Sequence, residues 1–177
     1  MTTELAYTGR PKVPIQRRAA AFMIDFVSVW LVTLLLGGNT LSQLLVFIVA
    51  WLGMRVVLVA KNQGQSLGRW ALDMKVIDAK FGKTPGLLEL SKREGLTGFG
   101  SILALLGLSI GLANSISLLL LSAPLAVDYG VALADSRSQQ TLHDRLARTA
   151  VVATHRGFSL DLRIKKLLAQ ATRRLKQ

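Results

Sequence analysis

Two long stretches of this chain are almost free of charged side chains, and they constrain its fold more than any other feature. Between residues 19 and 60 the only ionisable side chains are Asp25 and Arg55, and residues 95–127 have none. A helix of roughly 20 apolar residues crosses the hydrocarbon core of a bilayer. The first stretch is therefore long enough for two crossings. Its length and composition predict an integral membrane protein.

A turn signal divides the first stretch. Gly37-Gly38-Asn39-Thr40 combines residue types that favour turns, so we predict a membrane hairpin with helices at 19–37 and 41–60. The alternative of two buried helices in a soluble protein needs other elements to cover them, and the rest of the chain is too short and too charged. A cleaved secretory signal is disfavoured because Asp25 interrupts the apolar stretch and no small-x-small cleavage site follows it.

The second apolar stretch can form one long tilted crossing or two short ones. Lys and Arg are frequent before residue 19, in the connector 61–94 and after Asp128, whereas the turn near Gly38 has none. Cationic loops stay on the cytoplasmic side, which requires an even number of crossings. We therefore expect a second hairpin with helices at about 96–112 and 116–134. Gly107-x-x-x-Gly111, with Gly100 and Ala104 upstream, is a small-residue face suited to helix packing.

The segments outside the membrane have their own patterns. Residues 1–16 are polar and contain two prolines, so we expect a flexible tail before a membrane domain at 17–157. In the connector, Met74–Asp78 alternates weakly and Gly82 and Pro85 follow, which predicts a short β-hairpin. The predicted fold is thus all-α, with about four transmembrane helices as two hairpins and a small β-hairpin in the connector.

Residues 158–177 form a basic amphipathic pattern that begins after a capping residue, Ser159. Apolar side chains recur on one helical face, and cations lie mostly elsewhere. Such a helix lies in an anionic membrane interface. Nucleic-acid binding is the rival interpretation of a basic tail, but the membrane segments favour lipid headgroups as the partner. The cations expected to bind lipid are Arg163, Lys165, Lys166, Arg173 and Arg174.

Three charged residues are expected at one depth inside the membrane. Asp25, Arg55 and Asp128 each lie six or seven residues from a predicted helix end, or roughly 10 Å deep at the helical rise. Intramembrane charges are expensive and need a partner or a purpose. One interpretation is a structural ion pair of Arg55 with Asp25 or Asp128. The other is a cation or proton site, in which the acid that is not paired with Arg55 is free to bind the cation or proton.

Motifs for catalysis or cofactors are not evident in the sequence. The chain has no cysteine, and Gly64-x-x-x-Gly68 lacks the ending of a phosphate-binding loop. His143-Asp144 has no nucleophile or metal-ligand spacing around it. We expect this segment to form a clasp, in which Asp144 binds backbone donors or a basic partner such as Arg18. We therefore expect no enzyme activity, no cofactor and no metal site.

Three ordered motifs resemble the RDD family of bacterial membrane proteins: RAAAFMID at 18–25, GQSLGRWALDMKVID at 64–78 and QTLHDRLARTAVV at 140–152. The family is named for one arginine and two aspartates, which by motif match are Arg18, Asp25 and Asp144. Family members usually have Gly where Asp73 stands, and A-G-T where this chain has Ala-Arg-Thr at 147–149.

The resemblance implies a multi-pass protein of the bacterial cytoplasmic membrane, or of a thylakoid membrane if the source is photosynthetic. The family has been linked to transport of small solutes or ions. One hypothesis is therefore transport of a monovalent cation, a proton or a small solute, with a pathway between protomers of a homo-oligomer. The other is an accessory or assembly factor that binds a larger membrane complex. Carboxylates facing a wet cavity would favour transport, and carboxylates paired in a dry interface would favour the accessory role.

Overall fold

The first hairpin lies close to the place expected from hydropathy, although its first helix begins at Ile15 and not near residue 19. The structure is a computed structural model that describes residues 13–111, 115–134 and 139–154, with isolated positions at 159, 160, 162, 163 and 170. Helix α1 (Ile15–Leu36) is followed by α2 (Thr40–Leu52), one π-helical turn η1 (Gly53–Val57) and α3 (Leu58–Lys61), which continue one another. The predicted hairpin is confirmed.

Asn39 starts the second helix of this hairpin. Its side chain accepts a hydrogen bond from the backbone of Ser42 (2.9 Å), and the Ser42 hydroxyl accepts one from the backbone of Asn39 (2.8 Å). This reciprocal capping satisfies two donors that a helix start leaves unpaired. The chain turns tightly at Gly37, where a Cβ would lie 2.8 Å from the backbone of both Gln43 and Thr33. A larger residue there would open the turn.

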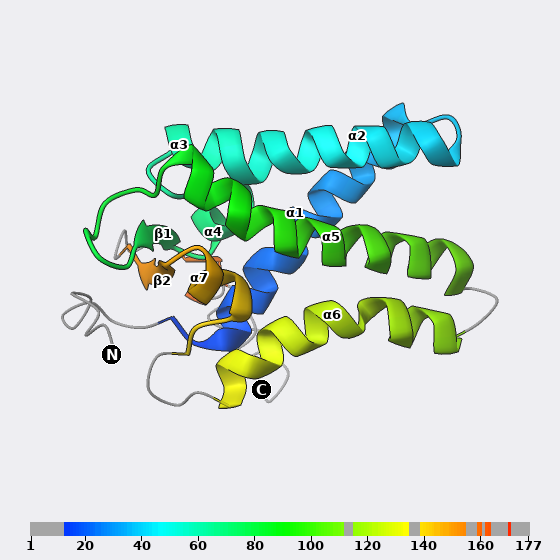
Figure 1. The fold of residues 1–177 in the computed structure, drawn as a ribbon. Coiled ribbons are helices and arrows are strands. Elements are labelled where there is room, and N and C mark those ends of the chain that lie inside the picture. Colours follow the sequence, from blue (N-terminus) through cyan, green and yellow to red (C-terminus); the bar gives the residue numbers. More distant parts are fainter. Residues whose placement is uncertain are drawn as a thin grey trace.

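The second pair of helices is α5 (Leu87–Gly111) and α6 (Ser115–Ala134), which lie side by side in Figure 1. The predicted small-residue face packs between them. A Cβ at Gly100 would lie 2.8 Å from Leu125, and one at Gly107 would lie 3.2 Å from Leu121. Small residues thus let the two helices approach closely.

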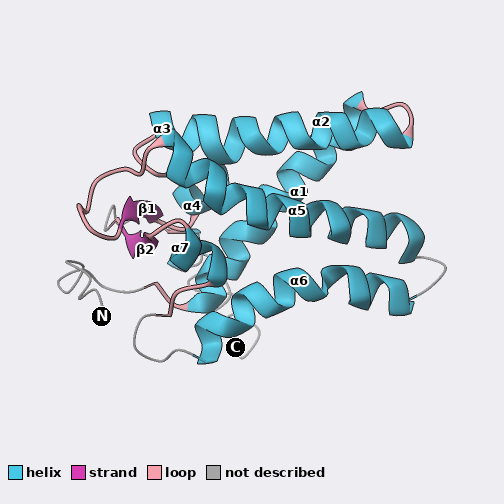
Figure 2. Cartoon of the chain, in the orientation of Figure 1, coloured by secondary structure: helices cyan, strands magenta, loops and turns pink. Residues whose placement is uncertain are grey.

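Among the described residues, three helical segments are long and apolar enough to span a membrane: Ile15–Leu36, Thr40–Lys61 and Ser115–Ala134. Helix α5 differs because its first turns contain charged residues, including Glu89 and Glu94. The fold is therefore mostly helical with three candidate spans and a small sheet (Figure 2). The fourth crossing, expected at 96–112, stays a prediction.

The strand expected in the connector exists, but the predicted β-hairpin is wrong. Strand β1 (Met74–Asp78) pairs antiparallel with β2 (Thr149–Ala153), and Val76 lies opposite Val151. The segment after β1 forms a tight turn, in which the Asp78 carboxylate accepts hydrogen bonds from the backbone of Lys80 and Phe81, both at 2.8 Å, but residues 79–86 form no second strand. The alternation of β1 predicted a strand, but its partner lies far along the chain.

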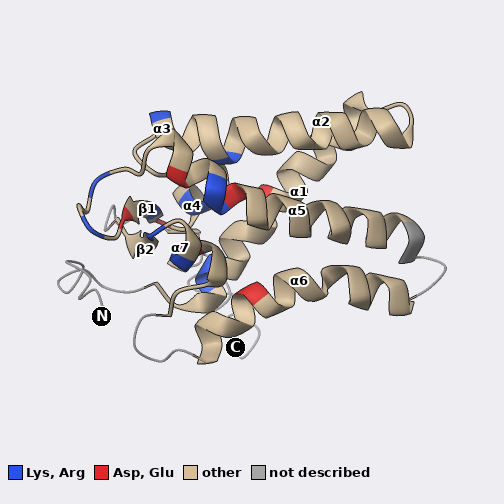
Figure 3. Ribbon diagram, in the orientation of Figure 1, with Lys and Arg blue, Asp and Glu red and all other residues tan. Residues whose placement is uncertain are grey.

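Two short helices complete the end of the molecule that contains the sheet. Helix α4 (Leu67–Ala71) begins at the Ser66 cap, and α7 (Leu142–Leu146) begins at the Thr141 cap. Helix α4 packs directly on α1, and a Cβ at Gly68 would collide with the backbone carbonyl of Ala21. We call residues 61–94 and 139–154 the polar end. Figure 3 shows that the charged residues gather at or near this end of the helices.

The bundle core is aromatic. Phe22 and Phe26 of α1 pack with Phe47 and Trp51 of α2, with ring centroids 5.6–6.2 Å apart. Away from this core the helices expose large apolar side chains, for example Leu119 at 70%. Exposed apolar faces on helices of this length are suited to lipid contact.

Candidate functional site

Asp25 is completely buried in α1, and its carboxylate is fully hydrogen-bonded. Arg55 Nη1 lies 2.5 Å from Oδ2, which also accepts a hydrogen bond from the Ser66 hydroxyl at 2.6 Å. The backbone N–H of Gly68 donates to Oδ1 at 2.7 Å. The absence of a side chain at Gly68 allows this approach. Asp25 therefore joins the first hairpin to α4 of the polar end.

Arg55 connects Asp25 to a second buried acid, Glu94. Its Nε donates to Glu94 Oε2 at 2.7 Å, and its guanidinium carbon lies 5.0 Å from the ring centroid of Trp51. Glu94 also accepts hydrogen bonds from Arg69 Nη2 and from the Thr97 hydroxyl, both at 2.9 Å. Arg55 belongs to the π-helical turn, a distortion that often marks functional sites.

The third buried acid, Asp144, binds two arginines from other helices. Arg18 Nη2 pairs with Oδ2, and Arg93 Nη2 lies 3.1 Å from Oδ1. Arg18 also donates to the backbone carbonyl of Gln139 at 2.6 Å. Burial by itself raises the pKa of Asp144, but the charges of Arg18 and Arg93 outweigh burial and hold this pKa well below its ordinary value. Asp144 is therefore ionised.

Asp128 binds His143 and not an arginine. Its two oxygens accept from the backbone N–H of His143 at 3.0 Å and from ring Nδ1 at 2.5 Å. On the other side of the ring, Arg93 Nη2 lies 3.1 Å from Nε2. An arginine can only donate, so Nε2 must accept and the imidazole is neutral. Burial is the main reason that the pKa of His143 is lower than its ordinary value.

These groups form one buried ion-pair network. It consists of Arg18, Asp25, Arg55, Arg69, Arg93, Glu94 and Asp144. The network joins α1, η1, α4, α5 and α7, so it links the polar end to the helices. Removing one partner of a buried pair costs about 3–5 kcal/mol, because the other charge is left uncompensated.

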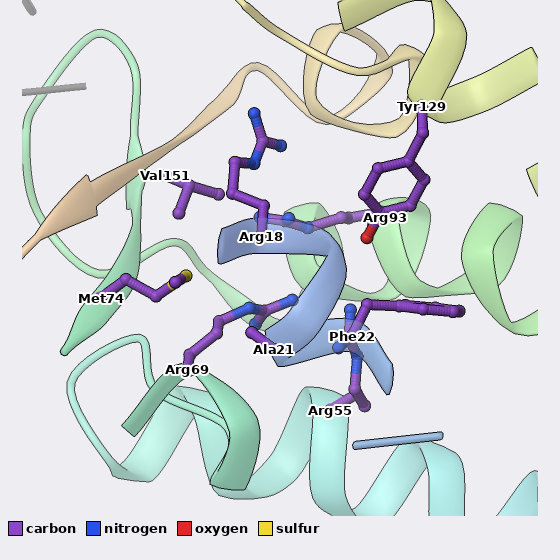
Figure 4. Close-up of a pocket in the computed structure, with 9 residues that line it drawn as sticks. All are labelled: Arg18, Ala21, Phe22, Arg55, Arg69, Met74, Arg93, Tyr129 and Val151. Carbon is purple, nitrogen blue, oxygen red and sulfur yellow. The ribbon is translucent and has the colours of Figure 1, made fainter. Parts of the chain in front are cut away.

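A cavity of about 10 Å³ lies inside this network (Figure 4). It is lined by side chains from α1, η1, α4, α5, α6 and the sheet: Arg18, Ala21, Phe22, Arg55, Arg69, Met74, Arg93, Tyr129 and Val151. Four of these are arginines, so the cavity is electropositive. Its volume is just enough for one water-sized species.

The structure brings together only some of the residues singled out in the sequence. Asp25 and Arg55 of the expected charge layer are in contact, whereas Asp128 pairs with His143 in the segment after α6. The motif residues Arg18 and Asp144 form the ion pair expected for the clasp.

Sequence reasoning missed the roles of Arg69, Arg93, Glu94 and the His143 ring. One signal was present. Arg93 and Glu94 are the last charges before the second apolar stretch, the same position that Arg18 has before the first apolar stretch.

The basic tail lies largely outside the described residues. Of the five cations expected to bind lipid, Lys165, Lys166, Arg173 and Arg174 fall there, and Arg163 is exposed. Ser159 is described and buried, and its hydroxyl oxygen accepts a hydrogen bond from Arg17 Nη2 at 2.9 Å.

Apolar helices of membrane-spanning length and a buried charge network at one end define a small helical membrane protein. The RDD family model matches residues 12–148, and the chain belongs to this family. The matched region contains the arginine and both aspartates assigned by motif. Comparison with curated proteins and with solved structures gave no significant match.

Proposed function

We propose that this RDD family protein is an accessory or assembly factor that binds a larger membrane complex. The observation that supports this role is that the buried carboxylates are paired with buried protein groups. Asp25 and Glu94 are 0% exposed and Asp128 is 3% exposed, and each accepts close hydrogen bonds from protein groups. Carboxylates satisfied in this way stabilise an arrangement of helices, whereas a transported cation needs acids that exchange partners.

The exposed helix faces are the surface proposed for partner contact. Val49 of α2 is 71% exposed and Leu119 of α6 is 70% exposed, whereas Val59 of α3 is fully buried. Lipid is as apolar as these side chains, so helix association in membranes depends on shape and packing more than on burial. A network that holds the helices rigidly would preserve such a shape.

Site-specific photo-crosslinking in cells tests this proposal. A photoreactive residue at Val49 or Leu119 should give an adduct of one defined mass with another membrane protein. The same residue at Val59 should give no intermolecular adduct and serves as the control. Adducts with lipid alone at both exposed positions, together with a monomeric protein in mild detergent, would refute the accessory role.

Transport of a monovalent cation, a proton or a small solute is the second candidate. The small cavity inside the network favours it, because a transported species needs an internal binding site. However, four arginines line this cavity and their charge repels cations. Proteoliposomes with a pH-sensitive dye inside test this candidate. Proton flux driven by a sodium or potassium gradient, and lost in Asp25→Asn, would favour transport over the accessory role.

The proposed topology has four membrane segments, with both termini and the connector on the cytoplasmic side of a bacterial inner membrane or a thylakoid. The support is the distribution of Lys and Arg along the chain. The chain has no cysteine, so single cysteines at Thr40, Lys80 and Ser138 can be tested with a membrane-impermeant thiol reagent. Only Thr40→Cys should react in intact cells, and reaction at either other position would contradict the topology.

The basic segment after Ser159 is proposed to bind anionic lipid headgroups, at about 1 kcal/mol per cation near the surface. Deleting residues 159–177 should leave the protein inserted. Binding of the corresponding peptide to anionic vesicles at low salt tests the lipid contact. If the peptide does not bind these vesicles, the proposed lipid contact is excluded.

A further inference from the structure

The cavity inside the ion-pair network is positively charged on several sides. Arg18 of α1, Arg55 of η1, Arg69 of α4 and Arg93 of α5 all line it. In Figure 4 the side chains of Arg69 and Arg93 approach the first turns of α1 from two sides. The positive potential also acts on the arginines themselves. Burial, together with the charges of Arg55 and Arg93, lowers the pKa of Arg69 to about 10.

Two of these arginines have donors that the protein leaves unused. Arg69 Nη1 and Arg93 Nη1 are buried and have no hydrogen-bond partner within the described part of the chain. Both side chains are at least nine-tenths buried, with 4% and 3% of their surface exposed. A buried charged donor without a partner is strongly unfavourable. Unused donors on two residues of one cavity indicate that something accepts hydrogen bonds there.

The balance of charge at the cavity points the same way. In the described residues, the ion pairs of the four lining arginines go to three carboxylates: Asp25, Glu94 and Asp144. Asp128, which is also buried, binds the neutral ring of His143 instead. Each arginine has a partner, but four arginines share three carboxylates, so the set carries one positive charge in excess, and the carboxylate of Asp128 reaches Arg93 only through the His143 ring. A monovalent anion would balance this excess, whereas a water molecule would satisfy the donors but not the charge.

We propose that this cavity is a binding site for a monovalent, single-atom anion of halide size, with chloride as the physiological example. The anion accepts hydrogen bonds from Nη1 of Arg69 and Nη1 of Arg93. The volume of about 10 Å³ admits one atom and excludes a bulky carboxylate such as gluconate. The anion thereby links α4 to α5, and this role is independent of whether the protein is an accessory factor or a transporter.

Thermal unfolding of the full-length protein in detergent tests the site. Sodium gluconate is replaced stepwise by sodium chloride or sodium bromide at constant ionic strength, and unfolding is followed by tryptophan fluorescence. A ligand of the folded state raises the melting temperature in proportion to the logarithm of its concentration above Kd. Both halides should raise the melting temperature, and the concentration at which the logarithmic rise begins reports Kd. Equal melting temperatures in halide and gluconate would overturn the proposal.

Variants assign the effect to the cavity. Arg93→Gln should raise Kd for the halide by about tenfold or more, because a charge-assisted hydrogen bond is lost. Lys92→Gln removes the neighbouring charge, which is exposed, and should leave Kd unchanged. If Arg93→Gln does not fold, Arg69→Lys decides the question, since it keeps the charge but lacks Nη1. A Kd that is the same in Arg69→Lys and the wild type would place any halide effect elsewhere and refute this site.

Discussion

The polar end and the apolar part of the helix bundle are held together in different ways. In the bundle, aromatic rings and small residues pack α1 against α2 and α5 against α6, and many apolar side chains stay exposed. Between the polar end and the helices, buried arginines and acids connect five elements through directional bonds. Apolar contacts discriminate little between helix arrangements in a membrane, because lipid is equally apolar. The comparison indicates that the charged network determines how the helices are arranged.

The largest expected effect comes from breaking the network at its centre. Arg55→Leu leaves Asp25 and Glu94 without their shared partner, so the free energy of unfolding should fall by about 3–5 kcal/mol. Adding Asp25→Asn or Glu94→Gln should restore part of the loss, with a coupling of about 0.5–3 kcal/mol. Unfolding by denaturing detergent measures both quantities.

Asp128→Asn is the control for this rescue. Because Asp128 pairs with His143, its effect should add to that of Arg55→Leu without coupling. Rescue by Asp128→Asn but not by Asp25→Asn would contradict the partner assignment.

A glycine pair compares steric contact in the two regions. Gly68→Ala places a methyl group against the carbonyl of Ala21, where α4 meets α1, so we expect a loss of about 3 kcal/mol or more. Gly95→Ala, in α5, meets nothing within 4 Å and should be neutral or stabilise by about 0.5–1 kcal/mol. Melting temperatures of the two variants provide the test, and equal values would mean that α4 does not pack tightly on α1.

Acid should weaken the polar end through His143. Its pKa is lower in the folded protein than the ordinary 6.5, so below that pH the unfolded chain binds a proton that the folded protein does not. Stability should therefore be constant above about pH 7.5 and fall by up to about 1.4 kcal/mol per pH unit below pH 6.5. The carboxyl of Asp144, with an ordinary pKa of 3.8, adds its own loss only at lower pH.

The pH dependence can be assigned with one variant. Unfolding measured between pH 7.5 and pH 5 should show a smaller slope in His143→Gln than in the wild type. If the two slopes agree, another group causes the acid sensitivity.

The smallest expected effect concerns the turn before β2. Arg148 is exposed and has φ +51°, a left-handed conformation that costs a residue with a Cβ about 1–2 kcal/mol. Its backbone contacts, to Arg145 and Ala79, do not require a side chain. Arg148→Gly should stabilise the protein by about 1 kcal/mol, and Arg148→Ala should not. A gain in both variants would mean that the side chain, not the backbone, is unfavourable.

Two residues with positive φ values lie at the positions where the sequence departs from the family motifs. Asp73, at φ +55°, and Arg148 stand at the two positions where the family resemblance leads us to expect Gly. The left-handed backbone is retained without glycine. At Asp73, hydrogen bonds from the hydroxyl and backbone N–H of Thr154 support it. The two substitutions therefore cost conformational free energy at these residues but do not change the fold.

The part of the candidate site that lies within the first hairpin was predictable from the sequence. Asp25 and Arg55 lie on the two helices of one hairpin, so a regular rise per residue places them at the same depth. The same reasoning failed for Asp128, because its partner His143 belongs to the segment that returns after α6. The strand at 74–78 was predictable from alternation, but its pairing with β2 was not.

By itself the sequence determined that this chain enters a membrane and turns near Gly38, since hydropathy sums over about 20 consecutive residues and needs no knowledge of distant contacts. Only the tertiary structure decided which acid binds which arginine. Arg55 and Glu94 are 39 residues apart in the chain, and Arg69 and Glu94 are 25 apart. Ion pairs depend on side-chain ends meeting within a few ångströms, a condition that the packing of α1, α4, α5 and α7 creates and that no local pattern encodes.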